Sequence, residues 1–201
     1  MKKVVDVLII GGGLEGSSLL LALQRHALRV LLVHDKPMVT NAQTGLDVRS
    51  LALAPASVNI FKSLQIWDKL ATQATPIQMI HASMKGAFGA TRLKGTFEKP
   101  LGFIAPLHDI ASTIQKNLST NACYAPAQFM ALDVENQTAQ IEYQGQTIEI
   151  RAQCIVVADG GRAWIREQVG LPLEVKHFHQ HAVVANIELA RSHQCIAYER
   201  F

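Results

Sequence analysis

The feature that most constrains the fold of this chain is a glycine-rich turn directly after a short apolar run. Residues 4–10 are almost continuously apolar and rich in β-branched side chains, as is typical of a strand buried on both faces of a parallel sheet. Residues 11–16 then read Gly-Gly-Gly-Leu-Glu-Gly and satisfy the pattern Gly-x-Gly-x-x-Gly. We predict a helix over residues 14–26 and a second strand over residues 29–33. This order of elements predicts a β-α-β unit that binds a dinucleotide.

Each glycine of this pattern has a physical role in such a unit. Gly11 permits the tight turn, Gly13 lets the backbone approach a pyrophosphate, and Gly16 allows the helix and strand to pack closely. The amides at the start of the helix, from Leu14 onward, would then bind the phosphates. Glycine turns are common in α/β proteins, so the pattern alone could mark a purely structural turn. Its place between a strand and a helix favours nucleotide binding.

The acidic residue expected at the end of the second strand is out of register. A carboxylate at this position binds ribose hydroxyls in units of this kind, yet the strand is followed by His34 and only then by Asp35. Asp35 has the expected spacing, but side chains alternate along a strand, which would direct it away from the ligand. Both residues are candidates for a ribose contact. A solvated loop aspartate is the alternative interpretation of Asp35.

Length and composition indicate one medium-sized globular domain, or one domain and part of a second. Of the 201 residues 17% are charged, and the net charge of +3 comes without a basic run, which argues against a nucleic-acid partner. The three cysteines, Cys123, Cys154 and Cys195, are far apart, as suits a reducing compartment. Asp6 interrupts the first apolar run, so we expect no secretion signal and a cytoplasmic protein, with peripheral attachment to the inner face of a membrane left open.

The rest of the chain is predicted to alternate short helices and strands, delimited by turn-forming residues and apolar periodicity. We predict a loop over 36–47, strands over 51–54 and 76–83, helices beginning at 55 and 107 with a break at 65, a hairpin or loop over 85–99, an antiparallel meander over 129–134, 139–143 and 147–150, a strand over 154–158, a helix over 164–169, and two antiparallel strands over 177–189 and 195–201. This order predicts a doubly wound α/β core with insertions.

A second polar motif follows the buried strand predicted over residues 154–158. Asp159 and Gly160 come directly after it. In open α/β sheets ligands bind beyond the carboxyl ends of the strands, where an aspartate can accept hydrogen bonds from sugar or ribityl hydroxyls. A turn or a helix cap is the alternative interpretation. Together with the glycine pattern, the motif favours a binding role.

Three histidines, His177, His179 and His181, alternate along one predicted strand, so their side chains could share a face. Imidazoles bind zinc or copper, but three of them on one strand rarely converge without a partner element. We therefore predict no metal site. The sequence identifies no catalytic acid or base.

Several motifs spread along the chain match one family. They are Asp6–Gly13, Asp47-Val48-Arg49, Leu101-Gly102-Phe103, Ala158-Asp159-Gly160 with Arg166, and Tyr198–Phe201. With this set the chain resembles the FAD-dependent aromatic hydroxylases of ubiquinone biosynthesis. The resemblance implies an α/β fold: a Rossmann-like FAD-binding domain with an inserted β-meander, over 1–73 and 105–172, and part of a β-sheet substrate domain, over 74–104 and 173–201.

The resemblance also implies the identity of the cofactor, the co-substrate and the class of substrate. Members of this family bind FAD and use NAD(P)H and oxygen to hydroxylate a phenol ring, here expected to carry a polyprenyl chain. Arg49 would lie beside the flavin phosphates, which a guanidinium can bridge, although a salt bridge to Asp47 is the alternative. The residues expected to bind the cofactor are Gly11, Gly13, Leu14, Gly16, His34, Asp35, Arg49, Asp159 and Gly160.

The sequence departs from the family pattern in three ways. His34 stands where the family has glutamate, Ala163 stands where it usually has serine, and the family continues with more of the substrate sheet and a Gly-Asp cofactor motif. One hypothesis is that the chain is the N-terminal part of a flavin monooxygenase and is inactive without a C-terminal half or a complementary chain. The whole enzyme would then be associated with a membrane or a biosynthetic complex. The alternative is a natural, short, non-catalytic module that binds a nucleotide or a partner.

Overall fold

The computed structural model describes residues 1–38, 49–161 and 163–201. Its two compact units comprise residues 1–41 with 114–181 and residues 42–113 with 182–201. Most of the loop predicted over 36–47 lies outside the described residues. Each unit contains β-sheets of its own.

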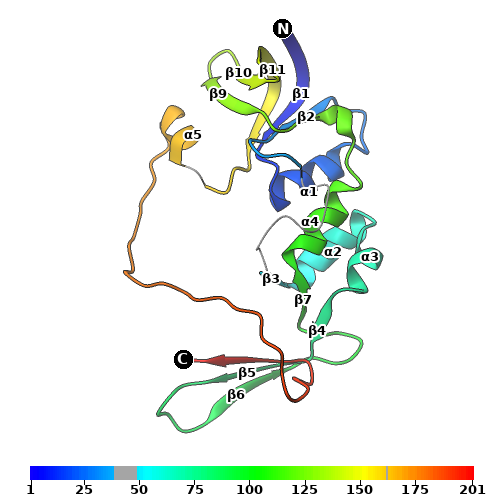
Figure 1. The fold of residues 1–201 in the computed structure, drawn as a ribbon, viewed down its shortest axis with the longest axis vertical. Helices are drawn as coiled ribbons and strands as arrows, with labels where there is room; N and C mark the ends of the chain where they lie inside the picture. Colours follow the sequence, from blue (N-terminus) through cyan, green and yellow to red (C-terminus); the bar gives the residue numbers. More distant parts are fainter. Residues whose placement is uncertain (39–48, 162) are drawn as a thin grey trace. The chain divides into compact units, whose positions relative to one another are not determined.

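The first unit is organised around a six-stranded mixed sheet (Figure 1). Its strands, in spatial order, are β8 (Cys123–Tyr124), β2 (Val30–Val33), β1 (Lys2–Ile10), β11 (Gln146–Val157), β10 (Thr138–Tyr143) and β9 (Gln128–Asp133). The unit also contains α1 (Leu14–Leu23), η1 (Thr120–Ala122) and α5 (Ala163–Gln168). Strands β8, β2, β1 and β11 are parallel, and β10 and β9 continue the sheet in antiparallel pairs. The predicted β-α-β unit of β1, α1 and β2 is confirmed.

Both faces of β1 and β2 are covered by apolar side chains. Ile9 and Leu32 are fully buried against Leu20 of α1. Leu8 and Ile10 point to the other face, where they belong to a larger buried cluster that includes residues of the meander. Burial on both faces explains why the sequence of β1 is a continuous apolar run instead of an alternating one.

Strand β11 differs from the prediction of two strands. The pattern predicts separate strands over 147–150 and 154–158, but the structure has one strand that pairs with β1 along most of its length and with β10 over its first part. The polar residues in between do not break it, because Ala152 is buried while Arg151 and Gln153 are exposed. The predicted meander is therefore present, and it continues the parallel sheet.

Helix α1 is shorter than predicted. It ends at Leu23 instead of His26. The side chain of Gln24 donates a hydrogen bond to the carbonyl oxygen of Asn117 (2.7 Å) and accepts one from the backbone N–H of Ser119 (3.1 Å). These bonds tie the end of α1 to the segment that leads into η1 and β8.

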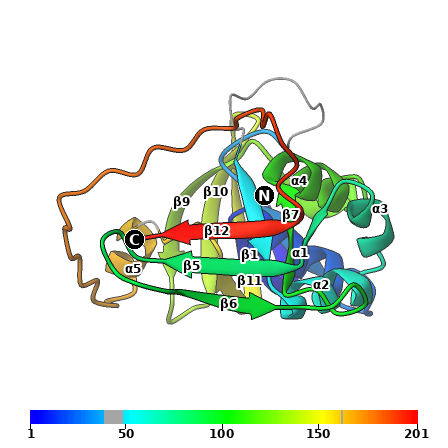
Figure 2. The ribbon, with the colours of Figure 1, turned by 90° about the horizontal axis from the view of Figure 1, so that it is seen from below.

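The second unit contains two three-stranded sheets, and Figure 2 shows the one that includes the last strand of the chain. One is antiparallel, with strand order β3 (Ser50–Leu53), β7 (Gly102–Pro106) and β4 (Thr75–Ile77). The other has the order β12 (Ile196–Arg200), β5 (Met79–Ser83) and β6 (Ala90–Lys94), with β12 parallel and β6 antiparallel to β5. The helices are α2 (Pro55–Ser63), α3 (Trp67–Ala71) and α4 (Leu107–Gln115), whose last two residues belong to the first unit.

Helices α2 and α4 begin where local signals predict, and α2 ends at the predicted break. Pro55 is the first residue of α2, and α4 follows Pro106 directly. The predicted break lies at Gln65, whose φ of +57° separates α2 from α3. The ring of Trp67 packs edge-on against Phe103, with centroids 4.9 Å apart.

The strand-like segment predicted over 76–83 is two strands in different sheets. It divides at Gln78, whose backbone N–H donates to the carbonyl oxygen of Cys195 (2.8 Å). The N-terminal part forms β4 and pairs with β7, a strand that the sequence pattern did not predict. The C-terminal part, β5, pairs with β6, so the hairpin comprises residues 79–94 instead of lying within the predicted range 85–99.

The prediction of two antiparallel strands near the end of the sequence is wrong. Residues 171–190 form no regular secondary structure, so the strand predicted over 177–189 is absent. The segment predicted over 195–201 forms β12, which pairs in parallel with β5. A strand requires regular backbone pairing with a neighbouring strand, and no described strand pairs in this way with 177–189.

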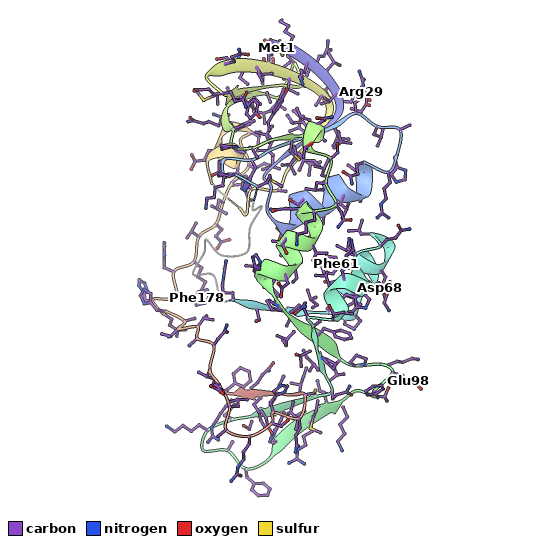
Figure 3. All side chains as sticks on the ribbon, turned by 45° about the vertical axis from the view of Figure 1, so that its right-hand side comes forward. Met1, Arg29, Phe61, Asp68, Glu98 and Phe178 are labelled. Carbon is purple, nitrogen blue, oxygen red and sulfur yellow. The ribbon has the colours of Figure 1, made fainter. Side chains whose placement is uncertain are left out.

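An ion pair between Asp6 and Arg29 joins β1 to the start of β2. The guanidinium of Arg29, labelled in Figure 3, donates to both carboxylate oxygens of Asp6, at 2.8 and 3.2 Å, and the backbone N–H of Arg29 donates to the same carboxylate at 2.8 Å. These hydrogen bonds lower the pKa of Asp6 below its usual range and raise the pKa of Arg29. The acidic residue within the first apolar run thus has a structural partner at the start of β2.

Candidate functional site

The glycine loop after β1 presents a row of backbone amides. Gly11 donates its N–H to Val33 (2.8 Å), and the N–H of Ser17 donates to the carbonyl oxygen of Gly13 (3.0 Å) as the first bond of α1. No described residue accepts a hydrogen bond from the amides between them, those of Gly12, Gly13, Leu14, Glu15 and Gly16. No side chain caps the helix. Such a helix start attracts an anion.

The glycines of this loop are required for different reasons. Gly11 has a φ of +111°, and a Cβ there would overlap the carbonyl oxygen of Ala158. A Cβ at Gly16 would overlap the carbonyl oxygen of Gly11. Gly13 is exposed, and the nearest atom to a Cβ there would be Oε2 of Glu15, at 3.5 Å. Packing inside the protein therefore explains Gly11 and Gly16 but leaves the space beside Gly13 open.

The Asp159 motif lies beside this loop because β11 runs parallel to β1. The backbone N–H of Ala158 donates to the carbonyl oxygen of Ile10 (2.7 Å), which aligns the ends of the two strands. Oδ1 of Asp159 accepts a hydrogen bond from the N–H of Gly161 (3.1 Å). Oδ2 is buried and has no hydrogen-bond partner among the described residues. A buried carboxylate oxygen without a donor is unfavourable, so this atom suits a ligand hydroxyl.

His34 is the residue at the end of β2 that faces the glycine loop. A Cβ at Gly12 would come within 2.7 Å of the His34 ring, so the imidazole lies against the loop backbone. Nδ1 of His34 is 3.2 Å from Oδ1 of Asp35. The side chain of His34 is 19% exposed and that of Asp35 39%, which leaves the histidine as the inner member of the pair.

The predicted site residues are divided between the two units. The glycine loop, His34, Asp35, Asp159 and Gly160 all belong to the first unit, at the carboxyl ends of β1, β2 and β11. Arg49 belongs to the second unit, where its carbonyl oxygen accepts a hydrogen bond from Leu107 (3.0 Å). Its alternative partner Asp47 lies outside the described residues.

Sequence reasoning missed the contribution of Ser17. This residue is 2% exposed, and its Oγ donates a hydrogen bond to the carbonyl oxygen of Gly12 (3.0 Å). The bond holds the loop and the first turn of α1 together. A serine on the buried side of an apolar helix, directly after the last glycine of the motif, is the sequence signal that could have identified it.

The histidine cluster has no metal-binding geometry. The rings of His177 and His179 are 6.3 Å apart on a segment without regular secondary structure. Within the described part of the chain, no three His, Cys, Asp or Glu side chains could together hold a metal ion. None of the described helices is long and apolar enough to span a bilayer.

Comparison with known proteins supports this interpretation of the site. Residues 4–198 match the family model described as FAD binding domain. The chain belongs to the FAD-binding domain family. Among its relatives, ubiquinone hydroxylase UbiL of Rhodospirillum rubrum is 31% identical over 99% of this chain and 47% of its own length. The 3-demethoxyubiquinol 3-hydroxylase of Escherichia coli is 24% identical over 91% of this chain and 48% of its own. The chain thus spans about half the length of these curated relatives and is related to hydroxylases of ubiquinone biosynthesis.

Solved structures show the same fold. PqsL of Pseudomonas aeruginosa superposes with a TM-score of 0.70 at 17% identity, over 88% of this chain and 48% of its own. The p-nitrophenol 4-monooxygenase PnpA of Pseudomonas putida superposes with a TM-score of 0.69 at 16% identity, over 85% of this chain and 44% of its own. The predicted α/β fold with a Rossmann-like FAD-binding domain is therefore confirmed.

The residues of the glycine loop fit an FAD cofactor. A diphosphate requires several N–H donors, and the start of α1 has five amides without a described acceptor. It also requires close approach to the backbone, which the open space beside Gly13 allows. Hydroxyl groups require an acceptor, and the buried Oδ2 of Asp159 is one. These three properties lie together at one edge of the sheet.

Proposed function

We propose that this chain is the N-terminal, FAD-binding portion of a flavoprotein monooxygenase that hydroxylates a polyprenylated phenol in ubiquinone biosynthesis. NAD(P)H and oxygen are its co-substrates. The observation that carries the proposal is the set of amides at the start of α1 beside Oδ2 of Asp159, none of which has a hydrogen-bond partner among residues 1–38, 49–161 and 163–201. Within the family, the motifs of this chain are most similar to those of 2-octaprenyl-6-methoxyphenol hydroxylase.

Each residue of the site has a proposed task. Gly11 and Gly16 shape the turn, and the amides of Gly13 and Leu14 hold the pyrophosphate. The pair of His34 and Asp35 contacts the adenosine ribose. Asp159 accepts hydrogen bonds from the hydroxyls of the cofactor, and the adjacent Gly160 helps to orient them. Arg49 binds the phosphates of the cofactor. When bound, FAD supplies the redox chemistry of hydroxylation, and the surrounding protein excludes water from it.

The domain assignment follows from the same proposal. Residues 1–73 and 105–172 form the FAD-binding domain, and residues 74–104 and 173–201 contribute to the substrate domain. The relatives are about twice as long as this chain. A complete substrate pocket therefore requires the part that corresponds to the remainder of a relative, on the same polypeptide or on a complementary one. The complete protein is proposed to work in the cytoplasm, at the inner face of the membrane or in a biosynthetic complex.

A titration with FAD tests the proposal. We expect the purified chain to quench flavin fluorescence saturably, with weak affinity, and to show no oxidation of NAD(P)H. A folded chain that leaves flavin fluorescence unchanged would contradict the proposed cofactor. Phenol-stimulated oxidation of NAD(P)H by the pure chain would contradict the need for a second half.

A complementation experiment separates an enzyme portion from a non-catalytic module. The chain is co-expressed with the unmatched remainder of the Rhodospirillum rubrum relative. For an enzyme portion we expect co-purification of the two polypeptides and tighter FAD binding by the pair than by either alone. A module would bind FAD with the same affinity whether or not the second polypeptide is present.

A further inference from the structure

The β5–β6 hairpin ends in an exposed loop that carries large apolar side chains. The strands pair in antiparallel fashion up to Ser83 and Ala90, and residues 84–89 form the tip (Figure 2). Phe88 is fully exposed, at 108% of its reference area, and Met84 is 61% exposed. A Cβ at Gly86 or Gly89 would have no atom within 4 Å. At the base of the tip the N–H of Lys85 donates to the carbonyl oxygen of Phe201 (2.6 Å), while the side chains of Met84 and Phe88 are exposed to solvent.

The same hairpin is strongly basic. Residues 79–97 contain Lys85, Arg92 and Lys94 and no aspartate or glutamate. Their combined charge equals the net charge of +3 of the whole chain. Arg92 and Lys94 lie on the same face of β6, since they are two residues apart in one strand. Within the described residues, none of the three cations is part of an ion pair.

Protection of a sheet edge explains only part of this arrangement. Strand β6 is an edge strand, and all five of its residues are exposed. Natural proteins place cations on such edges to prevent pairing with other chains, which accounts for Arg92 and Lys94. It does not account for an aromatic ring that is completely exposed at the tip. Singly exposed apolar residues are common on protein surfaces, but exposed apolar side chains that cluster, as Met84 and Phe88 do within one six-residue loop, mark sites of interaction.

The combination of exposed aromatic and basic side chains matches an anionic lipid surface. We propose that the β5–β6 hairpin docks this protein on an anionic membrane. Phe88 and Met84 enter the headgroup region, while Lys85, Arg92 and Lys94 attract lipid phosphates and keep their charged ends in water. This inference deepens the location at the inner face of the membrane that the proposed function includes, and its physical basis is independent of the cofactor.

Vesicle flotation with the full chain tests the proposal. Binding to vesicles of phosphatidylcholine alone is compared with binding to vesicles that also contain phosphatidylglycerol, at low and high salt. We expect binding only to the anionic vesicles, and a decrease at high salt because screening weakens the attraction. F88S should weaken partitioning on the order of tenfold. Replacement of each cation should weaken binding to the anionic vesicles about fivefold, so the double variant K85Q/R92Q should bind them about 25-fold more weakly than the wild type.

The matched control is F178S. Phe178, labelled in Figure 3, is also an exposed phenylalanine beside a lysine, with the Nζ of Lys176 5.2 Å from its ring centroid, but it belongs to the first unit. We expect F178S to bind vesicles as the wild type does. Thermal unfolding followed by circular dichroism confirms that each variant is folded, and FAD affinity should be unchanged in F88S.

Three results would overturn the proposal: no binding of the wild type to anionic vesicles, equal binding to neutral vesicles, or the same loss in F178S as in F88S. The first is also the result expected if the hairpin binds a protein partner. Failure of FAD binding in the wild type would contradict the proposed function and leave the vesicle measurement unaffected, so the two failures are distinguishable.

Discussion

Replacement of Gly13 by alanine tests whether a ligand approaches the glycine loop. Gly13 has a φ of −67° and a ψ of −169°, a conformation that alanine adopts readily. A Cβ there would make only an ordinary van der Waals contact with Glu15. Alanine reduces the conformational freedom of the unfolded chain, but it is a poorer N-terminal cap than glycine. These opposing terms are each below about 1 kcal/mol, so we expect a change in the free energy of unfolding within about 0.5 kcal/mol.

The expected effect on binding is much larger. The added methyl group would occupy the space through which a phosphate reaches the amides at the start of α1. Each lost hydrogen bond to a charged group weakens binding by roughly 1.5–3 kcal/mol. G13A should therefore reduce the affinity for FAD about 10- to 100-fold through the loss of a single bond.

Two measurements on the same samples check this prediction: thermal unfolding without FAD, and flavin fluorescence during titration with FAD. G11A is the matched control, because its Cβ would overlap the carbonyl oxygen of Ala158 and its φ is +111°. We expect G11A to lose about 1–3 kcal/mol of stability, whereas G13A keeps its stability and loses affinity. A stable G13A that binds FAD as tightly as the wild type would refute the inference that a phosphate lies against Gly13.

Three further predictions concern Asp159, Asp6 and Leu8. D159N keeps an acceptor for the Gly161 amide but loses its charge, so FAD affinity should fall about tenfold with little change in melting temperature; unchanged affinity would remove Asp159 from the site. The hydrogen bonds from Arg29 lower the pKa of Asp6, so the stability from this pair is present at neutral pH and is lost as the pH falls through the pKa of the folded state. Urea unfolding of D6N should therefore show a smaller loss of stability between about pH 6 and about pH 3 than the wild type, and an equal loss would contradict the pairing. Leu8 is fully buried, so L8A should lower the free energy of unfolding by about 2–5 kcal/mol in urea at neutral pH, and a loss below about 1 kcal/mol would contradict its place in the core.

The sequence alone predicts the elements whose signals are local. The apolar run before the glycine pattern identified β1, and the pattern itself identified the loop and the start of α1. Pro55 marked the beginning of α2, and the break at Gln65 separated it from α3. These signals depend on the conformational preferences of a few neighbouring residues, which are the same wherever the segment lies in the fold.

The candidate site could be assembled from the sequence only in part. The order of strands indicated that Asp159 and the glycine loop lie at the same edge of a parallel sheet, as the pairing of β1 with β11 shows. It did not reveal that Oδ2 of Asp159 is buried with no hydrogen-bond partner in the described part of the chain, or that the ring of His34 lies against Gly12. Burial and contact depend on atoms that are distant in sequence, so only the folded chain determines them.

Strand partners are the features that only the tertiary structure decided. The alternation over 177–189 is compatible with a strand, yet this segment has none of the regular pairing that β12 finds with β5. Strand β7 was not predicted, and β11 was predicted as two strands, although each pairs on both sides in the folded chain. A helix satisfies its backbone hydrogen bonds within its own segment. A strand satisfies them with a neighbour that can lie anywhere in the sequence, so its existence and extent depend on the whole fold.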